Sequence, residues 1–520
     1  MRLLSCLLAA AGIWNCATAK STNAALNQRQ TTSSYPAHTI DMPIDHFPNS
    51  SRYAPHTNAT FKQRYYFDSS YYKPGGPVYL YIGGETSGPS RFSNLETGII
   101  QILMEATNGL GVILENRYYG QSYPFNSSTT DELVYLTTEQ TIADNAYFAQ
   151  HATFPGVNAS LTAPNTPWIL YGGSLAGAQT AFSVKTYGDI LYGGIASSGT
   201  IIAKVVYPEW YAPIQKFGPS DCIASINAIV DKMDLLISRN ETQAIAELKA
   251  IFGLESIPDI RDFAATIAAP IGSPMFYPTY TWQELNWDPD YGSDDFWYFC
   301  TNVTNLDAPE NVTSVDYALA NYTDGEAWTN LGNYARYIQE FVIPICSSGD
   351  LNSISCFGTQ DPTYWAGTSN SGTRSYLYSS CIEQGAYQAA PAYGPSLISR
   401  VIQVDYTQQW CTWAFPAGKY NSIPPTPDVS IYASYGSYNF SAERLAFVDG
   451  SSDVWLDMCY HSNDAPERTS SDLHPELLIE GSGHHWDSYG ILDVDVEPQF
   501  IRNAHLWEIR TVKKWLRDFQ

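Results

Sequence analysis

The sequence predicts an α/β protein whose parallel sheet is interrupted by a helical, disulfide-bearing insert. Short apolar runs typical of buried strands alternate with segments of helical spacing up to residue 205. Strand-like runs return near residue 445, after a long stretch dense in Tyr, Trp, Gly and Asn. With 520 residues, the chain is long enough for a large core and more than one structural unit. We therefore expect one sheet domain formed by residues 39–205 and 431–520, divided by an insert at 206–430.

Strands are expected where β-branched and aromatic residues form short runs between turn residues. The expected strands cover residues 40–47, 61–67, 78–82, 111–114, 168–171, 191–196, 445–448 and 477–479. Apolar residues at helical spacing predict helices over 94–107, 137–149, 175–187, 206–250 and 500–519. Thr137 and Gln140 fit a capping box at the start of the second of these helices. Beyond the strand at 111–114, we expect Glu115 and Arg117 to form an internal ion pair.

The N-terminus has the pattern of a secretory signal over residues 1–19. Arg2 precedes an apolar stretch that is too short to span a membrane, and Ala17-Thr18-Ala19 forms an A-x-A cleavage site. Residues 20–38 are rich in Ser, Thr, Asn and Gln and are expected to form a mobile lead-in. We therefore expect a secreted protein, with the vacuole or lysosome as the alternative destination.

Nine N-x-[ST] sequons support the secretory route, because a signal and many glycosylation sites together are typical of a secreted glycoprotein. The sequons begin at Asn49, Asn58, Asn126, Asn158, Asn240, Asn302, Asn311, Asn321 and Asn439.

Seven cysteines follow the predicted signal. They are Cys222, Cys300, Cys346, Cys356, Cys381, Cys411 and Cys459. An oxidising compartment permits three disulfides and one thiol, for which Cys459 is the candidate, and the pairing of the other six stays open. The sequence has no C-x-x-C pair, which would favour a zinc site, so we expect no metal.

The charge balance excludes two classes of partner. A formal net charge of −25 and a pI near 4.6 leave no basic patch that could attract nucleic acid or an anionic membrane. The same acidity is typical of a protein that works in acid, and equally of a highly soluble secreted protein.

Ser174 is the strongest candidate for a catalytic residue. It lies in Tyr171-Gly172-Gly173-Ser174-Leu175-Ala176-Gly177, between a predicted strand and a predicted helix. Small neighbours are typical of a nucleophile elbow, a strained turn that projects a serine hydroxyl above the sheet. Such a serine needs an imidazole to accept its proton and a carboxylate to orient that imidazole.

The two late strands are each followed by suitable partners. Asp449 or Asp453 follows the strand at 445–448, and His484 or His485 follows the strand at 477–479. The chain order of serine, acid and histidine is that of α/β-hydrolases. Spacing alone leaves both choices open.

Six motifs carry a resemblance to a known family. They are D-H-F at 45–47, F-K-Q-R-Y at 61–65, E-N-R-Y-Y-G-Q-S at 115–122, G-G-S-L-A-G at 172–177, D-G-S-S-D-V-W at 449–455 and G-S-G-H-H-W-D at 481–487. Together they resemble the serine carboxypeptidase family that contains lysosomal Pro-X carboxypeptidase, dipeptidyl peptidase II and fungal acid prolyl endopeptidases. The resemblance implies that Ser174 is the nucleophile, Asp453 the triad acid and His484 the general base. This chain differs from the family motifs at Leu175, Ala176, Asp449 and Val454.

Further candidates surround the predicted nucleophile. The oxyanion hole is expected to use the backbone N–H of Leu175 and that of Gly83 or Gly84, in the loop after the strand at 78–82. Glu85 is a candidate pocket residue that would bind a peptide amino group, or else be solvated. Trp455 matches a family tryptophan that walls an apolar pocket, with core packing as the alternative.

The resemblance implies peptide substrates, cleaved on the carboxyl side of proline through an acyl-enzyme, without a metal or organic cofactor. Two other functions fit the same residues: a secreted esterase or lipase of the same fold, and a non-catalytic glycoprotein that binds a partner. The sequence leaves open whether cleavage is terminal or internal, and which oligomer forms.

Overall fold

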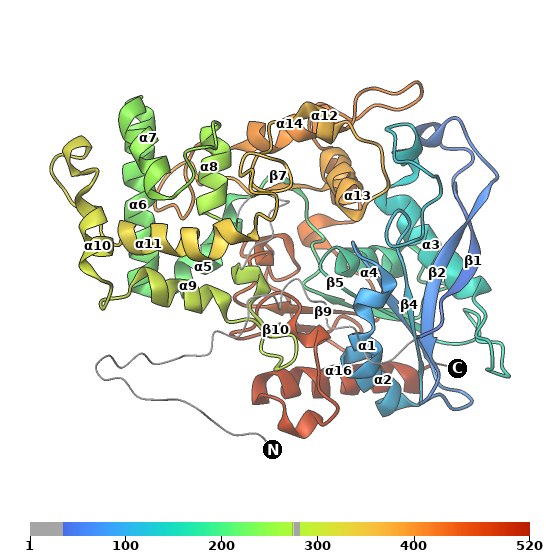
Figure 1. Cartoon of the computed structure of the whole chain (residues 1–520). Helices are drawn as coiled ribbons and strands as arrows, with labels where there is room; N and C mark the ends of the chain where they lie inside the picture. The colour runs from blue at the N-terminus through green and yellow to red at the C-terminus, as the bar shows by residue number, and fades with distance from the viewer. Residues whose placement is uncertain (1–34, 273, 275–280, 520) are drawn as a thin grey trace, which may run out of the picture. The chain divides into compact units, whose positions relative to one another are not determined.

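The structure, a computed structural model that describes residues 35–272, 274 and 281–519, contains an eight-stranded sheet (Figure 1). The strand order is β1-β2-β4-β3-β5-β6-β9-β10, with β1 and β2 antiparallel to their neighbours and the other pairs parallel. The strands are β1 (His38–Pro43), β2 (Thr60–Asp68), β3 (Val78–Ile82), β4 (Leu110–Leu114), β5 (Trp168–Gly173), β6 (Gly193–Ser197), β9 (Leu445–Gly450) and β10 (Glu476–Ile479). The predicted signal and nearly all of the predicted lead-in lie outside the described residues.

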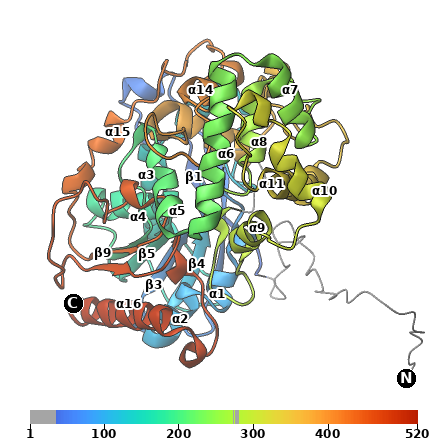
Figure 2. The ribbon, with the colours of Figure 1, turned by 90° about the vertical axis from the view of Figure 1, so that its left-hand side faces the viewer.

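Helices cover both faces of this sheet. They are α1 (Ser93–Glu96), α2 (Ile99–Thr107), α3 (Thr138–His151), α4 (Leu175–Thr186) and α16 (Gln499–Arg517). Figures 1 and 2 show α2 and α16 side by side. Both belong to one apolar cluster with Tyr79 and Tyr81 of β3, in which α2 packs on β3 and α16 packs on α2 and β10. Helices α3 and α4 pack on the opposite face, with Val78, Leu80 and Ile82. The alternation along β3 is that expected of a strand buried on both faces.

The strand order is that of an α/β-hydrolase, so the predicted fold class is confirmed. Each strand and helix predicted for the sheet domain is present; β3 has the predicted ends, and the ends of the others are shifted. The predicted helix over 94–107 is broken between α1 and α2 at Gly98, where an added Cβ would lie 2.6 Å from the Ser488 carbonyl oxygen. The close approach of that loop requires glycine at this position.

The predicted ion pair between Glu115 and Arg117 is wrong. The buried Arg117 guanidinium instead donates to both carboxylate oxygens of Asp144 in α3, at 2.7 and 2.6 Å. The Glu115 carboxylate accepts from the backbone N–H of Gly88 and the hydroxyl of Ser122.

The segment between β6 and β9 contains the predicted insert, residues 206–430. Its helices are α5 (Ala212–Phe217), α6 (Ser220–Ser238), α7 (Thr242–Ile251), α8 (Ile260–Ile267), α9 (Asp295–Val303), α10 (Glu310–Thr313), α11 (Leu331–Tyr337), α12 (Pro362–Trp365), α13 (Gly372–Ser379) and α14 (Val404–Ala414). Strands β7 (Lys204–Val206) and β8 (Gly385–Tyr387) pair in a second small sheet, and α15 (Ser430–Ala433) follows. The limits of the insert at 205/206 and 430/431 stay predictions.

Three disulfides cross-link the insert, as predicted. They join Cys222 to Cys300, Cys346 to Cys356 and Cys381 to Cys411, and Cys459 is a buried free thiol. Of the helices that the structure describes, none combines the length and apolar character needed to cross a membrane.

Candidate active site

Ser174 lies at the tip of a sharp turn between β5 and α4. Its backbone has φ 60° and ψ −127°, a conformation that costs a non-glycine residue free energy and recurs at functional sites. Two glycines make the turn possible: a Cβ on Gly172 would lie 2.2 Å from the Ala176 carbonyl oxygen, and one on Gly177 would lie 2.8 Å from Gly199 Cα. The small residues of the predicted elbow are therefore required by close backbone approach.

Asp453 and His484 come together at the carboxyl ends of β9 and β10. Both carboxylate oxygens of Asp453 lie within hydrogen-bond distance of His484 Nδ1, at 3.0 and 2.9 Å. Both side chains are buried, with 0% and 5% of their surface exposed. The two loops are also joined by the N–H and hydroxyl of Ser452, which both donate to the Ser482 carbonyl. A carboxylate bonded to Nδ1 leaves Nε2 as the ring nitrogen free to accept a proton.

The two rival candidates have other partners. Asp449 accepts hydrogen bonds from His461, one from Nδ1 at 2.7 Å and one from the backbone N–H at 3.1 Å. His485 Nδ1 is bonded to Ser488 Oγ, and its backbone N–H donates to Ser198 Oγ. Burial, together with the neighbouring His484, lowers the pKa of His485 well below its usual range.

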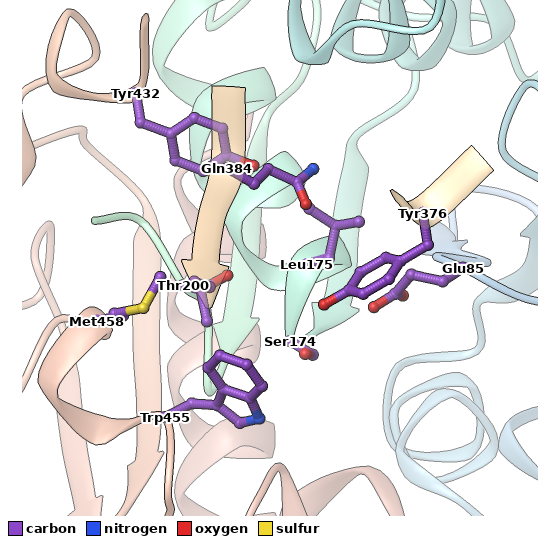
Figure 3. A pocket seen from close by; sticks show the side chains of 10 residues that line it. Glu85, Ser174, Leu175, Thr200, Tyr376, Gln384, Tyr432, Trp455 and Met458 are labelled. Atoms are coloured by element: carbon purple, nitrogen blue, oxygen red, sulfur yellow. The ribbon is translucent and has the colours of Figure 1, made fainter. Parts of the chain in front are cut away.

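Ser174 opens into a pocket with an empty volume of about 360 Å³, counted with its solvent-open mouth (Figure 3). The lining residues are Glu85, Ser174, Leu175, Thr200, Tyr376, Gln384, Ala386, Tyr432, Trp455 and Met458. Figure 3 shows Trp455 and Met458 on one side of Ser174, and Glu85 and Tyr376 on the other. The pocket therefore has an apolar side and a side with a carboxylate and a phenol.

The expected oxyanion donors lie around the elbow. Leu175 is the first residue of α4, so its N–H has no carbonyl partner within the helix. The Gly83 N–H donates to the Leu114 carbonyl at 2.9 Å, which excludes it as a donor to substrate. Gly84 has a φ of +68°, and a Cβ there would lie 3.6 Å from Ala176 Cβ, so this loop faces the first turn of α4. Of the two glycines, only Gly84 keeps an N–H for an oxyanion.

Trp455 and Glu85 both line the pocket. The indole of Trp455 stacks on Tyr207, with ring centroids 5.7 Å apart and planes at 10°, and its ring centroid lies 6.3 Å from that of His484. Glu85 is half-buried beside Tyr376. Trp455 is thus both packed and exposed to the pocket, and its two predicted roles are compatible.

Sequence reasoning missed the residues that the insert and α15 bring to the pocket. Tyr376 in α13, Gln384, Ala386 in β8 and Tyr432 in α15 all line it. The density of aromatic residues in this part of the chain was the available signal, but it does not identify which ones reach Ser174. His461, the partner of Asp449, was missed because it lies twelve residues further along the chain, in the loop between β9 and β10, where no motif marks it.

The chain is similar to known proteins over nearly its whole length. The model of the family described as serine carboxypeptidase S28 matches residues 42–503. A "Probable extracellular serine carboxypeptidase" of Arthroderma benhamiae is 37% identical over 504 residues, covering 93% of this chain and 68% of the relative. The "Serine protease vicPa" of Bipolaris victoriae is 26% identical, covering 89% of this chain and 87% of the relative. The human "Lysosomal Pro-X carboxypeptidase" is 25% identical, covering 92% of this chain and 87% of the relative. The chain therefore belongs to the serine carboxypeptidase S28 family and is a serine-type peptidase.

Proposed function

We propose that this peptidase cleaves peptides on the carboxyl side of proline through a triad of Ser174, Asp453 and His484. The observation that carries the proposal is the buried Asp453–His484 pair, which follows two late strands as the strained Ser174 turn follows β5. In a parallel sheet these carboxyl ends share one edge, where α/β folds bind their substrates.

In the proposed reaction, Ser174 Oγ attacks the carbonyl carbon of the scissile bond while His484 Nε2 takes the hydroxyl proton. The resulting oxyanion accepts hydrogen bonds from the N–H groups of Leu175 and Gly84. His484 then gives its proton to the leaving amine, which departs and leaves an acyl-enzyme. Water attacks the acyl carbon under the same base and restores Ser174. Asp453 holds the imidazole and stabilises its charged form throughout.

The preference for proline is supported by the apolar side of the pocket. The flat Trp455 ring is fixed by its stack on Tyr207, and Met458 and Ala386 add further apolar surface. A pyrrolidine ring matches such a surface because it is compact, apolar and rigid, and it has no N–H donor when acylated. The human relative carries the name Pro-X carboxypeptidase, which agrees with this assignment.

Secretion and action in acid complete the proposal. The predicted signal, the nine sequons and the name of the Arthroderma relative agree on an extracellular protein. At a net charge of −25, protonation of carboxylates in acid lowers the self-repulsion of the chain. Eight of the nine sequon asparagines are exposed, and Asn302 is half-buried.

The test compares wild-type protein with Ser174→Ala at acid pH on matched peptides and esters. We expect release after proline, none after alanine in the same peptide, and none from the variant. Robust ester turnover without release from proline peptides would favour an esterase and contradict the proposal. Absence of both activities in folded protein would favour a binding glycoprotein.

A second experiment distinguishes cleavage at a peptide terminus from cleavage at an internal bond. Mass spectrometry of fragments from one proline-containing peptide, with free and then blocked ends, identifies which end is needed. A requirement for a free amino end would support Glu85 as its ligand, and Glu85→Gln should then raise KM for that peptide alone.

A further inference from the structure

Residues 282–287 of the insert, here called the bridging segment, lie against both loops that carry the proposed acid and base. Four hydrogen bonds connect the segment to these loops, and each uses the indole N–H of a tryptophan. They join Trp282 Nε1 to the Ser452 carbonyl (2.8 Å), Trp455 Nε1 to Gln283 Oε1 (3.1 Å), Trp486 Nε1 to the Leu285 carbonyl (2.7 Å) and Trp287 Nε1 to the Trp486 carbonyl (2.9 Å). Trp282 and Trp287 donate from the segment to the loops, and Trp455 and Trp486 donate from the loops to the segment. Hydrogen bonds in both directions therefore hold the insert against both loops.

These bonds attach beside the proposed catalytic groups. Ser452 directly precedes Asp453, and Trp486 lies two residues after His484. The Trp486 ring also packs on the backbone before His484, since a Cβ on Gly483 would lie 2.7 Å from Trp486 Nε1. A displacement of the bridging segment would therefore be transmitted to both members of the Asp–His pair.

The helical part of the insert supports the bridging segment. Trp282 is buried, and its ring packs edge-on against Phe296 of α9 at a centroid distance of 5.2 Å. Helix α9 also carries Cys300, which is bonded to Cys222 in α6. The segment thus connects the two loops to a cross-linked support outside the main sheet.

We propose that the bridging segment positions the triad by holding the Asp453 and His484 loops at a fixed separation; this inference rests on the proposed function. The reason is geometric, because a base misplaced by about 1 Å loses roughly 100-fold in rate. Trp282, Trp287 and Trp486 do not belong to the residues that line the pocket. They act through the loops, as positioning residues rather than catalytic ones.

The test removes single indole donors and measures the reactivity of Ser174 directly. Trp282→Phe and Trp287→Phe each keep an aromatic ring and delete the indole N–H. Trp287 is only half-buried, so Trp287→Phe should still fold if the change at the buried Trp282 does not. Trp328→Phe is the matched control, because Trp328 is fully buried in the insert and donates to Thr323 Oγ1 instead of a triad loop. The readouts are the second-order rate of labelling by a fluorophosphonate probe, its pH profile, kcat and KM, and thermal stability.

We expect labelling and kcat to fall about 10- to 100-fold in the segment variants, with KM little changed and the acid limb of the labelling profile shifted. Trp328→Phe should label at the wild-type rate even where it loses as much thermal stability. Equal labelling of segment variants and control would show that the segment only docks the insert, and so would a change confined to KM. Labelling that is absent from wild type, or equal in Ser174→Ala, would refute the nucleophile and with it the proposed function.

Discussion

The hydrogen-bonded pair of Asp449 and His461 should contribute free energy to folding, and this contribution should fall as the pH rises. Asp449 is 1% exposed at the end of β9, four residues before the proposed triad acid. Burial on its own would lower the pKa of His461, but the hydrogen bond and the charge of Asp449 outweigh burial and raise that pKa, with a further contribution from Glu476 and an opposing one from Arg468. The charged imidazole is therefore favoured in the folded protein.

The perturbation is Asp449→Asn, which removes the charge and keeps the shape. The carboxylate accepts two hydrogen bonds from His461, at 2.7 and 3.1 Å, and the amide oxygen keeps both as weaker bonds. Hydrogen bonds to a charged group contribute more than neutral ones, so we expect a loss of about 2 kcal/mol at pH 5.

The pH dependence follows from the raised pKa of His461. Its contribution is fully present below the unfolded value of about 6.5 and is lost as pH rises through the folded value. The difference in unfolding free energy between wild type and Asp449→Asn should therefore be largest near pH 5 and shrink towards pH 9.

Denaturant unfolding followed by tryptophan fluorescence at several pH values measures this difference, provided that the slope with denaturant stays the same. Asp41→Asn is the matched control, because the Asp41–Lys62 pair is more than 60% exposed on both sides and surface pairs contribute little. A difference that is constant with pH, or that grows above pH 7, would refute a charged His461.

Three further outcomes are expected. Asp453→Asn should keep the fold and lower kcat by roughly 10³- to 10⁴-fold, because His484 loses the partner that fixes its tautomer; near wild-type peptide hydrolysis would contradict the triad. Gly172→Ala should abolish fluorophosphonate labelling, since its Cβ would lie 2.2 Å from the Ala176 carbonyl oxygen, and unchanged labelling with unchanged circular dichroism would count against the elbow. Glycopeptide mass spectrometry should find Asn302 bare and the other sequons occupied, because Asn302 is half-buried within α9; a glycan on it would overturn this prediction.

The features that the sequence predicted well have local signals. The Ser174 turn was identifiable because small residues surround the serine in sequence, and the close approach that requires Gly172 is to Ala176, only four residues away. The buried strands were recognisable because apolar runs of four to six residues stand between turn residues. The order of the late strands then limited the acid and base to two candidates each.

Contacts between distant residues could not be predicted in the same way. Arg117 pairs with Asp144 of α3 because that helix packs against β1 and α4, whereas the expected partner Glu115 was chosen only for its proximity in sequence. Tyr376 reaches the pocket through the path of the insert, which depends on packing between helices far apart in the chain. No periodicity encodes such contacts.

The disulfides found in the described residues all belong to the insert, and none ties the strands of the main sheet or the proposed triad to one another. One of them, Cys381–Cys411, lies close in sequence to Gln384 and Tyr376 of the pocket wall. Reduction of this disulfide would therefore loosen the wall of the pocket, whereas none of the three disulfides directly joins the Ser174 turn to the loops of the proposed acid and base. Reduction of Cys222–Cys300 would instead weaken the support that α9 gives to the bridging segment, so the shape of the pocket and the spacing of the two loops depend on different disulfides.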